Sequence, residues 1–526
     1  MTKAASFSAI KVPSVFSQEL TDSTKKIITE DLTARGIQDI ILPEGRVVLG
    51  QDAALIEQGS LAIAIGKSAG QVSQLVEGIS IGKEAGRYCQ GLYAIAIGAV
   101  AGISNQQAGG IAIGLQAGNT SQGFGCVSLG IRAGISNQGN QSICIGYECG
   151  RISQGGKAVA IGDKAGETSQ KNHAISIGTS SGNLSQNEYS IAIGWEAGNE
   201  MQSSNCVAIG YQAGQESQCN GSVAIGYSAG ENCQGASNVA IGYKAAEQDQ
   251  QTLGVAIGHR SGQETQGDYT VAIGNIAGNV SQKDYAIAIG NTAAELNQGT
   301  RAIAIGASSG YEDQGDNAVS IGFDSGVTEQ GLDCVAVGNR AGHSSQKQRS
   351  IAIGYNSGEV NQSNSSVAIG SHSGRSNQQP GSISLGVYSG SICQGQYGIA
   401  IGWYAGQTSQ GSNGLAIGQD AGYENQGEDT VAIGTAAGET SQQDYSIAIG
   451  CNAGSVSLTT NSIAIGHLAA SSSSSSNSIT LNATGIELLP EEDSSFYVKP
   501  IRGDAPGVLK QLYYNTTTGE ITFDNT

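Results

Sequence analysis

Residues 190–205 read "SIAIGWEAGNEMQSSN", and residues 206–221 repeat the pattern as "CVAIGYQAGQESQCNG". In both stretches, aliphatic residues stand three positions and one position before a glycine, with a small residue between them. From Gly50 this glycine, here called the register glycine, returns at every sixteenth position to Gly466, 27 times without an insertion or deletion. A fixed period of this kind is typical of repeat proteins whose units stack on one another.

The pattern of the unit predicts strands and turns. Aliphatic–small–aliphatic alternation places both aliphatics on one face of a short strand. The register glycine ends that strand where the backbone turns or approaches another segment closely. A helix is disfavoured because each of the two or three glycines in a unit costs about 1 kcal/mol. We therefore expect coils of two short strands and two turns, stacked into two parallel sheets.

The same pattern predicts a thin core. We expect the two aliphatics of each coil to line its interior, together with one alanine and one glutamine. The small residues between the aliphatics then form a flat strip suited to packing against another chain, which predicts a homo-oligomer. With coils ~4.8 Å apart, the 27 units predict a rod about 130 Å long.

A glutamine stands eight positions after the register glycine in 25 consecutive units, from Gln58 to Gln442, and Leu458 ends the row. An exposed position would vary between units as its neighbours do. A constant glutamine instead predicts a ladder of hydrogen-bonded amides, since buried amides need partners. The alternative is a row that faces a ligand. Ladder members include Gln58, Gln202, Gln218, Gln234, Gln250 and Gln442.

The position directly after the register glycine holds an aromatic residue in some units and Lys, Asp, Asn, Thr or Ala in others. This variation means that the repeat does not require an aromatic there. Rings in consecutive units either stack to stiffen a corner or form an exposed strip for sugar rings or a protein partner. The residues of this candidate strip are Tyr147, Trp195, Tyr211, Tyr227, Tyr243, Phe323, Tyr355 and Trp403.

The composition excludes several function classes. A net charge of −19 disfavours nucleic acid as a partner, because phosphates need a basic face. No stretch approaches 18 consecutive apolar residues, so we expect no membrane span. The N-terminal residues lack the apolar core of a secretory signal. The ten cysteines show no metal-ligand spacing and are interpreted as free thiols.

The motifs of catalysis and recognition are products of the repeat or weak signals. "GYSAG" at 226–230 matches a nucleophile elbow, as do 66–70, 178–182 and 306–310, but its serine lies at a variable position of the unit. The five histidines fall in separate units, and the acidic residues scatter over variable positions. The tripeptide at 502–504, "RGD", matches an integrin-type recognition loop, but such a short string is a weak signal and is also an ordinary turn composition. We expect no enzyme activity, no metal and no cofactor.

Three regions follow from where the period starts and stops. Residues 1–45 form an N-terminal cap or attachment segment, with a short helix expected over 21–36. Residues 46–482 form the solenoid, whose last coil is degraded because Asn482 replaces the register glycine. Residues 483–526 form a small C-terminal β unit, in which "LYYNTTTGEITF" predicts a hairpin.

Two family resemblances add to this interpretation. The phrases "SIAIG", "SVAIG" and "NVAIG" resemble the head domains of trimeric autotransporter adhesins, over residues 46–482. In that family three chains each form a left-handed parallel β-roll, which implies a homotrimer here. The C-terminal "FYVKPIR" and "LYYNTTTGEIT" resemble the end of fibre-like repeat proteins of large double-stranded DNA viruses and tailed phages.

We therefore expect an all-β protein, a parallel β-solenoid or β-roll of 16-residue coils in a homotrimeric rod with small caps at both ends. The predicted function is a structural virion fibre or surface decoration, made in the host cytoplasm, that attaches to a host surface. Its predicted partners are copies of itself, a host-surface glycan or protein, and other virion proteins through the termini. The alternative is a cellular surface adhesin or carbohydrate-binding β-solenoid at the cell surface.

Overall fold

The computed structural model describes residues 45–472, 474–501 and 512–523. These residues form strands and turns and contain no helix. The helix expected over 21–36 and the tripeptide at 502–504 lie outside the described residues. By its internal contacts the chain divides into two units, which meet in sequence between Ile257 and Gly258. Each unit is a parallel β-solenoid of 16-residue coils, so the predicted all-β solenoid is confirmed.

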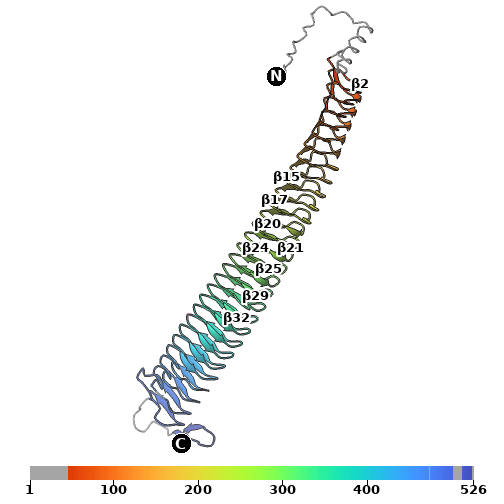
Figure 1. Ribbon diagram of the computed structural model, residues 1–526. Helices are drawn as coiled ribbons and strands as arrows, with labels where there is room; N and C mark the ends of the chain where they lie inside the picture. The colour runs from red at the N-terminus through yellow and green to blue at the C-terminus, as the bar shows by residue number, and fades with distance from the viewer. Residues whose placement is uncertain (1–44, 473, 502–511, 524–526) are drawn as a thin grey trace, which may run out of the picture. The chain divides into compact units, whose positions relative to one another are not determined.

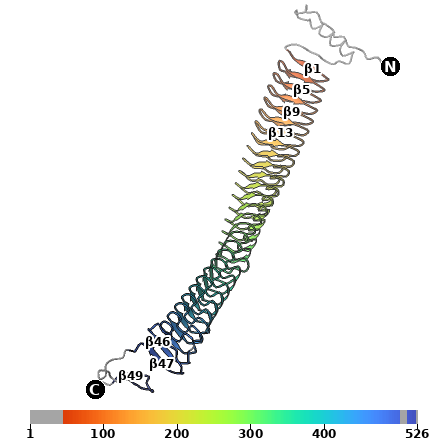
Figure 2. The same cartoon turned by 90° about the vertical axis from the view of Figure 1, so that its left-hand side faces the viewer.

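The first unit has one main sheet with one strand from every coil. Its strands are β1 (Val47–Leu49), β3 (Ile63–Ile65), β5 (Ile79–Ile81), β7 (Ile95–Ile97), β9 (Ile111–Ile113), β11 (Val127–Leu129), β13 (Ile143–Ile145), β14 (Val159–Ile161), β15 (Ile175–Ile177), β16 (Ile191–Ile193), β17 (Val207–Ile209), β18 (Val223–Ile225), β20 (Val239–Ile241) and β22 (Val255–Ile257). Successive strands pair in parallel, and each residue lies opposite the residue 16 positions later, as Ile191 lies opposite Val207. Figure 2 shows β1, β5, β9 and β13 in this order along the stack.

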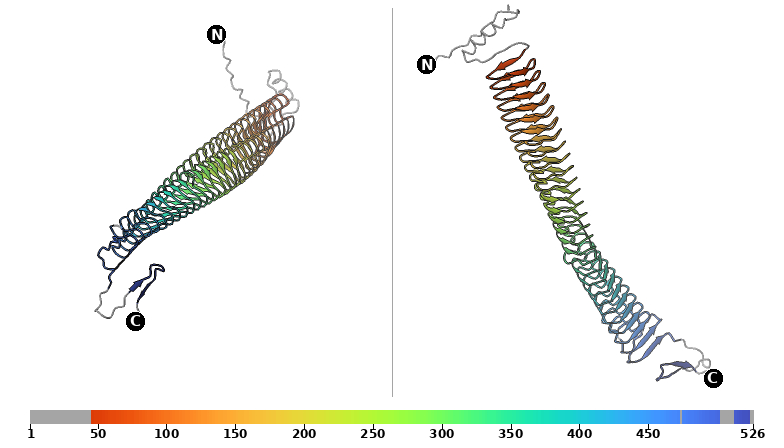
Figure 3. Two further views of the ribbon diagram at one scale, coloured as in Figure 1. Left: turned by 90° about the horizontal axis from the view of Figure 1, so that it is seen from below. Right: turned by 90° about the vertical axis from the view of Figure 1, so that its right-hand side faces the viewer.

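The second unit repeats this arrangement. Its main sheet contains β24 (Val271–Ile273), β26 (Ile287–Ile289), β28 (Ile303–Ile305), β30 (Val319–Ile321), β31 (Val335–Val337), β33 (Ile351–Ile353), β35 (Val367–Ile369), β37 (Ile383–Leu385), β39 (Ile399–Ile401), β41 (Leu415–Ile417), β43 (Val431–Ile433), β44 (Ile447–Ile449), β45 (Ile463–Ile465), β46 (Ile479–Asn482) and β47 (Phe496–Lys499). Its blue coils lie one above the next in Figure 3.

A second strand, also of three residues, ends at the row glutamine in many coils. In the first unit these strands are β2 (Ile56–Gln58), β4 (Val72–Gln74), β6 (Tyr88–Gln90), β8 (Ser104–Gln106), β10 (Thr120–Gln122), β12 (Ser136–Gln138), β19 (Asn232–Gln234) and β21 (Gln248–Gln250). In the second unit they are β23 (Glu264–Gln266), β25 (Val280–Gln282), β27 (Leu296–Gln298), β29 (Glu312–Gln314), β32 (Ser344–Gln346), β34 (Val360–Gln362), β36 (Ser376–Gln378), β38 (Ile392–Gln394), β40 (Thr408–Gln410) and β42 (Glu424–Gln426). Between them single parallel bridges, such as Leu184 with Glu200, continue the pairing. Figure 1 labels β2 and β21 on this side of the first unit.

Small residues, not aliphatics, fill the interior of the coil. In β33, Ala352 at the middle of the strand is 0% exposed, whereas Ile353 beside it is 37% exposed. The expectation that the aliphatics line the interior is therefore wrong, and the strip of small residues lies inside rather than outside. The two facing segments stand so close that Ala or Ser and one Gln fill the space between them. Alanines three positions after the register glycine complete this core, as Ala197 does beside Ala192.

One coil carries cysteines at both of these interior positions. Cys144 and Cys149 form a disulfide, with their Cα atoms 5.7 Å apart. The interpretation of all ten cysteines as free thiols is therefore wrong for this pair. The other eight are free, and three of them are buried. Burial raises the pKa of the Cys206 and Cys334 thiols, so these two are uncharged at neutral pH.

The register glycine is required by close contact between neighbouring coils. Gly210 has a φ of +135°, and a Cβ added to it would lie 2.1 Å from the carbonyl oxygen of Gly226. A side chain at this position would therefore collide with the backbone of the next coil. The physical requirement that the sequence pattern indicated, a close approach of two backbone segments, is present at this corner.

Non-glycine residues adopt left-handed conformations at the other corners. In one coil these are Glu196, Met201 and Asn205, with φ of 52°, 51° and 61°. Each conformation turns the backbone N–H toward the preceding coil, where the Glu196 N–H donates to the Thr179 carbonyl at 2.9 Å. Hydrogen bonds between coils thus satisfy the backbone of the turns and offset their strain.

The stack continues past the last repeat. β47 pairs in parallel with β46, so that Ile479 lies opposite Phe496 and Asn482 opposite Lys499. Phe496–Lys499, which the sequence analysis placed in the separate C-terminal region 483–526, therefore belong to one more coil of the stack. After them, β48 (Leu512–Tyr514) and β49 (Ile521–Phe523) pair antiparallel, which confirms the predicted hairpin.

Candidate interaction surfaces of the coils

The glutamine row lies inside the coils, and its amides are hydrogen-bonded in series. Gln202 is 0% exposed. Its Nε2 donates to the Oε1 of Gln218 at 2.9 Å and to the Ile191 carbonyl of its own coil at 3.1 Å. Its Oε1 accepts from the Nε2 of Gln186 at 3.0 Å. Both donor hydrogens and the acceptor are therefore used within the protein, which leaves no group of this amide for a ligand.

The other predicted ladder residues lie in the same row. Gln218 donates to Gln234 at 3.0 Å, and Gln234 donates to Gln250 at 3.3 Å. Gln58 begins the row in a half-buried position and donates to Gln74 at 3.3 Å. Gln442 ends it, accepting from Gln426 at 3.4 Å and donating to the Val431 carbonyl at 3.0 Å.

Serine hydroxyls also bond to the amides of the row, and at two points a serine connects glutamines that are not bonded to each other. The Gln74 Nε2 donates to the Ser80 Oγ at 3.3 Å, and the Ser80 hydroxyl donates to the Gln90 Oε1 at 2.7 Å. Ser128 relays in the same way between Gln122 and Gln138. The small residue between the aliphatics is visible in the sequence, but this role of a serine there was not predicted. Serine is accepted in the interior because the adjacent amide uses its hydroxyl.

Four residues of the predicted aromatic strip form a continuous ladder of rings. The Tyr211 and Tyr227 ring centroids are 4.8 Å apart with planes at 5°, and Tyr227 and Tyr243 are 5.2 Å apart. Trp195 lies 6.1 Å from Tyr211 with a tilt of 31°. Since the rings face one another, the ladder itself covers the faces of Tyr211 and Tyr227. Any other molecule at these two tyrosines meets ring edges and hydroxyl groups.

The remaining four predicted residues are not part of this ladder. Tyr355 meets the ring of His372 at 71°, and Trp403 lies 5.0 Å from Tyr404. In the described part of the chain, Tyr147 and Phe323 make no ring contact. Phe323 is 54% exposed and Trp403 is 51% exposed. The eight residues therefore do not form one site.

The sequence analysis missed a second aromatic cluster, one position further along the coil. His372, Tyr388 and Tyr404 follow the register glycine by two residues in successive coils. Their rings stack at 4.5 Å and 5.2 Å. Tyr355 and Tyr423 meet the two ends of this stack edge-on. The printed sequence contains the signal, because rings separated by 16 residues at any one position of the unit must lie over one another.

The histidine of this cluster is held in its neutral form. The Nε2 of His372 lies 3.3 Å from the Asn356 Nδ2, and its Nδ1 lies 2.9 Å from the Ser371 Oγ. Both ring nitrogens therefore lie within hydrogen-bond distance of a neighbouring polar side chain. Burial lowers the pKa of His372, and the charge of Arg375 lowers it further, although Glu359 opposes them.

Ion pairs between carboxylates and guanidinium groups connect neighbouring coils. Glu359 lies 2.8 Å from the Arg375 Nε and 3.1 Å from the Arg340 Nη2. The Arg132 guanidinium, 2.8 Å from Glu148, holds the pKa of that carboxyl below its ordinary value. These charges stabilise the stack and do not form a pair of opposed carboxylates across a cleft.

The serines of the nucleophile-elbow matches lie in turns at positive φ, and no helix follows them, which such an elbow needs. They are Ser68, Ser180, Ser228 and Ser308. Over the described residues, no group of three His, Cys, Asp or Glu side chains is placed to hold a metal ion. In the same residues, no helix has the length and hydropathy to cross a membrane.

The outward-pointing aliphatics form the largest apolar surface of each unit. We call it the aliphatic face, and it consists of the residues three positions and one position before each register glycine. Among them Ile305, Ile353 and Ile369 are 37–39% exposed. Two such residues stand on each strand of the main sheet, so the face runs along the sheet of each unit. Large continuous apolar patches are rare on proteins that act as monomers.

Comparison with protein-family models, with curated proteins and with solved structures finds no match for this chain.

Proposed function

We propose that this chain is a structural protein of a virion, the shaft of a surface fibre or outer decoration that serves attachment to a host surface, and that it works as a homotrimer. The observation that carries the proposal is the aliphatic face. Two parallel rows of half-buried Ile and Val along a whole sheet expose more apolar surface than is usual for a chain that acts alone. The resemblance of the repeat to trimeric adhesin heads supports the homotrimer, and the resemblance of the C-terminal segment to viral fibre-like proteins supports the choice of a virion fibre.

The periodicity of the face favours a second copy as its partner. Neighbouring coils are ~4.8 Å apart in every copy, so the aliphatic rows of two copies match in spacing along their length. An unrelated partner would need the same repeat to contact the face continuously. If each copy covers the aliphatic face of the next, the copies form a ring, and the ring is complete when the last copy meets the first. Covering the face removes apolar surface from water, which is the main favourable term in association.

The experiment that tests this proposal is the molar mass of the purified full chain by light scattering, with electron micrographs of the same sample. We expect three times the chain mass and particles longer than they are wide. A mass of one chain at micromolar concentration would contradict the proposal.

A charged variant connects the mass to the aliphatic face. Replacing Ile191 and Ile193 with lysine places two charges on the aliphatic face, and we expect the particles to dissociate while the β circular dichroism signal remains. The matched control is Met201→Lys, because Met201 belongs to the same coil and is 58% exposed at another corner. If both variants kept the same mass, the contact would lie elsewhere.

A further inference from the structure

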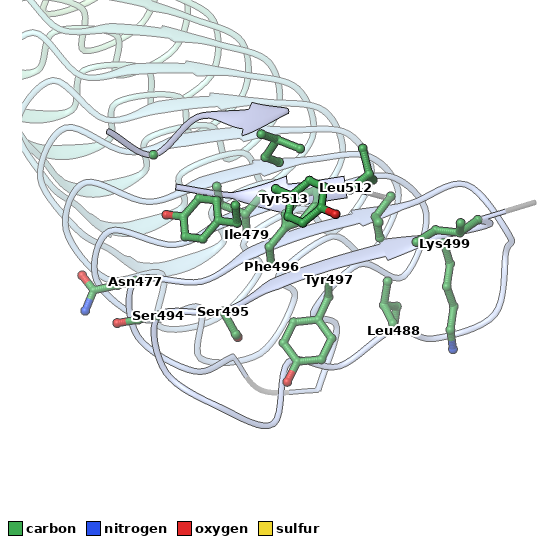
Figure 4. Close-up of a pocket in the computed structure, with 15 residues that line it drawn as sticks. Asn477, Ile479, Leu488, Ser494, Ser495, Phe496, Tyr497, Lys499, Leu512 and Tyr513 are labelled. Atoms are coloured by element: carbon green, nitrogen blue, oxygen red, sulfur yellow. The ribbon is translucent and has the colours of Figure 1, made fainter. Parts of the chain in front are cut away.

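The C-terminal hairpin lies beside the last coils with an open apolar pocket between them. The pocket has a volume of about 940 Å³. Ile479 and Phe496 of β46 and β47 line one side, and Leu512, Tyr513 and Ile521 of the hairpin line the other. Figure 4 shows Leu512 and Tyr513 of the hairpin beside Ile479 and Phe496 of the coils.

The hairpin is poorly packed on its own chain. Leu512 is 73% exposed, Tyr514 65% and Ile521 57%. On the coil side, Phe496 is 55% exposed. A hairpin of two short strands is marginally stable by itself, and it needs a packed apolar face to persist. Contacts within one chain do not supply that face.

The coil side of the pocket belongs to the aliphatic face. Ile479 stands opposite Ile463 of β45, and Phe496 stands opposite Ile479, so the pocket lies at the C-terminal end of the same rows. If copies associate along the aliphatic face with closed symmetry, the same end of each chain meets the same end of its neighbour. A neighbouring copy is then present at the mouth of the pocket.

We propose that the hairpin is a clasp between subunits: the pocket between β46–β47 and β48–β49 receives aliphatic side chains from the last coil of a second copy of this chain. This inference rests on the proposed assembly and names one residue set that secures it. Ten residues, 502–511, separate Ile501 from Leu512. A chain of that length spans at most about 35 Å, enough for the hairpin to contact both its own coil and a neighbour's.

A small apolar ligand is the less favoured occupant. Sites for small molecules are enclosed and largely formed before binding. Here one wall is a hairpin whose named apolar residues are each at least half exposed, and that wall gains stability only from a partner with its own extended apolar surface. The last coil of a second copy has such a surface, with part-exposed aliphatics on β45 and β46.

Photo-crosslinking of the full chain tests the clasp. Tyr513 is replaced by p-benzoylphenylalanine, the protein is irradiated, and the products are separated by denaturing electrophoresis and mapped by mass spectrometry. We expect products of two or more chains, linked to peptides containing β45, β46 or β47. The matched control places the same residue at Tyr445, which is 57% exposed in the same unit and does not line the pocket. The control is expected to yield none of these links.

The outcomes separate this inference from the proposed assembly. Links within single chains only, at a solution mass of three chains, would overturn the clasp and leave the assembly intact. A solution mass of one chain would overturn the assembly itself. A second variant, Leu512→Asp with Ile521→Asp, is expected to lose the interchain product of the Tyr513 probe, and persistence of that product would also overturn the clasp.

Discussion

At the scale of single residues, the register glycine is the least replaceable position. Replacing Gly210 with alanine places a Cβ 2.1 Å from the Gly226 carbonyl oxygen and strains a φ of +135°. We expect a loss of roughly 3 kcal/mol or more, seen as a lower melting temperature by circular dichroism. The control is Gly221→Ala, where φ is +73° and the nearest atom, the Ser237 Oγ, is 3.6 Å away. That change should cost about 1 kcal/mol, and equal losses would contradict the steric argument.

The glutamine row gives a second prediction at this scale. Gln218→Leu removes the acceptor of the Gln202 amide and the donor to the Gln234 amide oxygen, which should cost roughly 1–3 kcal/mol for each orphaned group. The melting temperature should fall, and Gln234→Leu should act in the same way. Gln443→Leu is the control, because Gln443 follows the row residue Gln442 and is exposed. Unchanged or higher stability in Gln218→Leu would show that the amides are not needed.

A third prediction concerns pH. The pKa of His372 is lower in the folded chain than its ordinary value of about 6.5. The neutral His372 therefore contributes its full stability above the ordinary value of about 6.5. This contribution is lost as the pH falls from there through the lowered pKa of the folded chain. We expect the melting temperature to fall between about pH 7.5 and pH 5, and to fall less in His372→Gln. His173→Gln, which removes a ring stacked on Tyr189 at 5.0 Å, is the control. Identical pH profiles in wild type and His372→Gln would contradict this.

At the scale of the element, a three-residue strand has no stability of its own. Each strand is stabilised by the parallel strands on either side of it, so the coil rather than the strand is the unit that adds or removes stability. The coil also sets the register, because the side chains of a strand alternate between interior and surface. A shift by one residue would place Ile inside a space that holds Ala.

Deletion of one coil tests this dependence. Removing residues 199–214 joins Gly198 to Gln215 and keeps every later residue at its position in the unit. We expect the variant to keep its β circular dichroism signal and nearly all of its melting temperature. Removing residues 199–213 instead shifts the register by one and should abolish cooperative melting at the junction. Similar behaviour of the two deletions would show that coil register does not control stability.

At the scale of the whole molecule, charge opposes the proposed assembly and apolar burial favours it. Each chain carries a net charge of −19, so copies repel one another at low ionic strength. Salt screens this repulsion, with a Debye length of ≈ 10 Å at 0.1 M and ≈ 3 Å at 1 M. We expect the proportion of assembled protein in dilute samples to rise with sodium chloride, as measured by light scattering. Assembly that weakened with salt would point to contacts between opposite charges in place of the aliphatic face.

Much of the fold follows from the sequence, because the same residue types recur at the same positions from one repeat to the next and chance patterns do not. The register glycine, the constant glutamine and the absence of insertions predict the parallel stack, and the flanks of residues 515–519 predict the hairpin. The candidate surfaces were predicted less well. Trp195 and its three tyrosine neighbours lie together as their spacing requires, but the stacking covers ring faces that the sequence left open for a ligand. The His372 cluster was not predicted, because its rings stand one position further along the repeat than those of the candidate strip.

The sequence by itself determined the period, the strands, the turns and the set of residues that share a face of each strand. It could not determine which face is inside, because alternation of period two is the same pattern seen from either side of a strand. The tertiary structure decided this point. Closing a coil of 16 residues brings its two sides so near that Ala, Ser and one Gln fill the interior, and the larger Ile and Val are left to point outward. The apolar surface that would normally build a core thus lies on the outside of the coil.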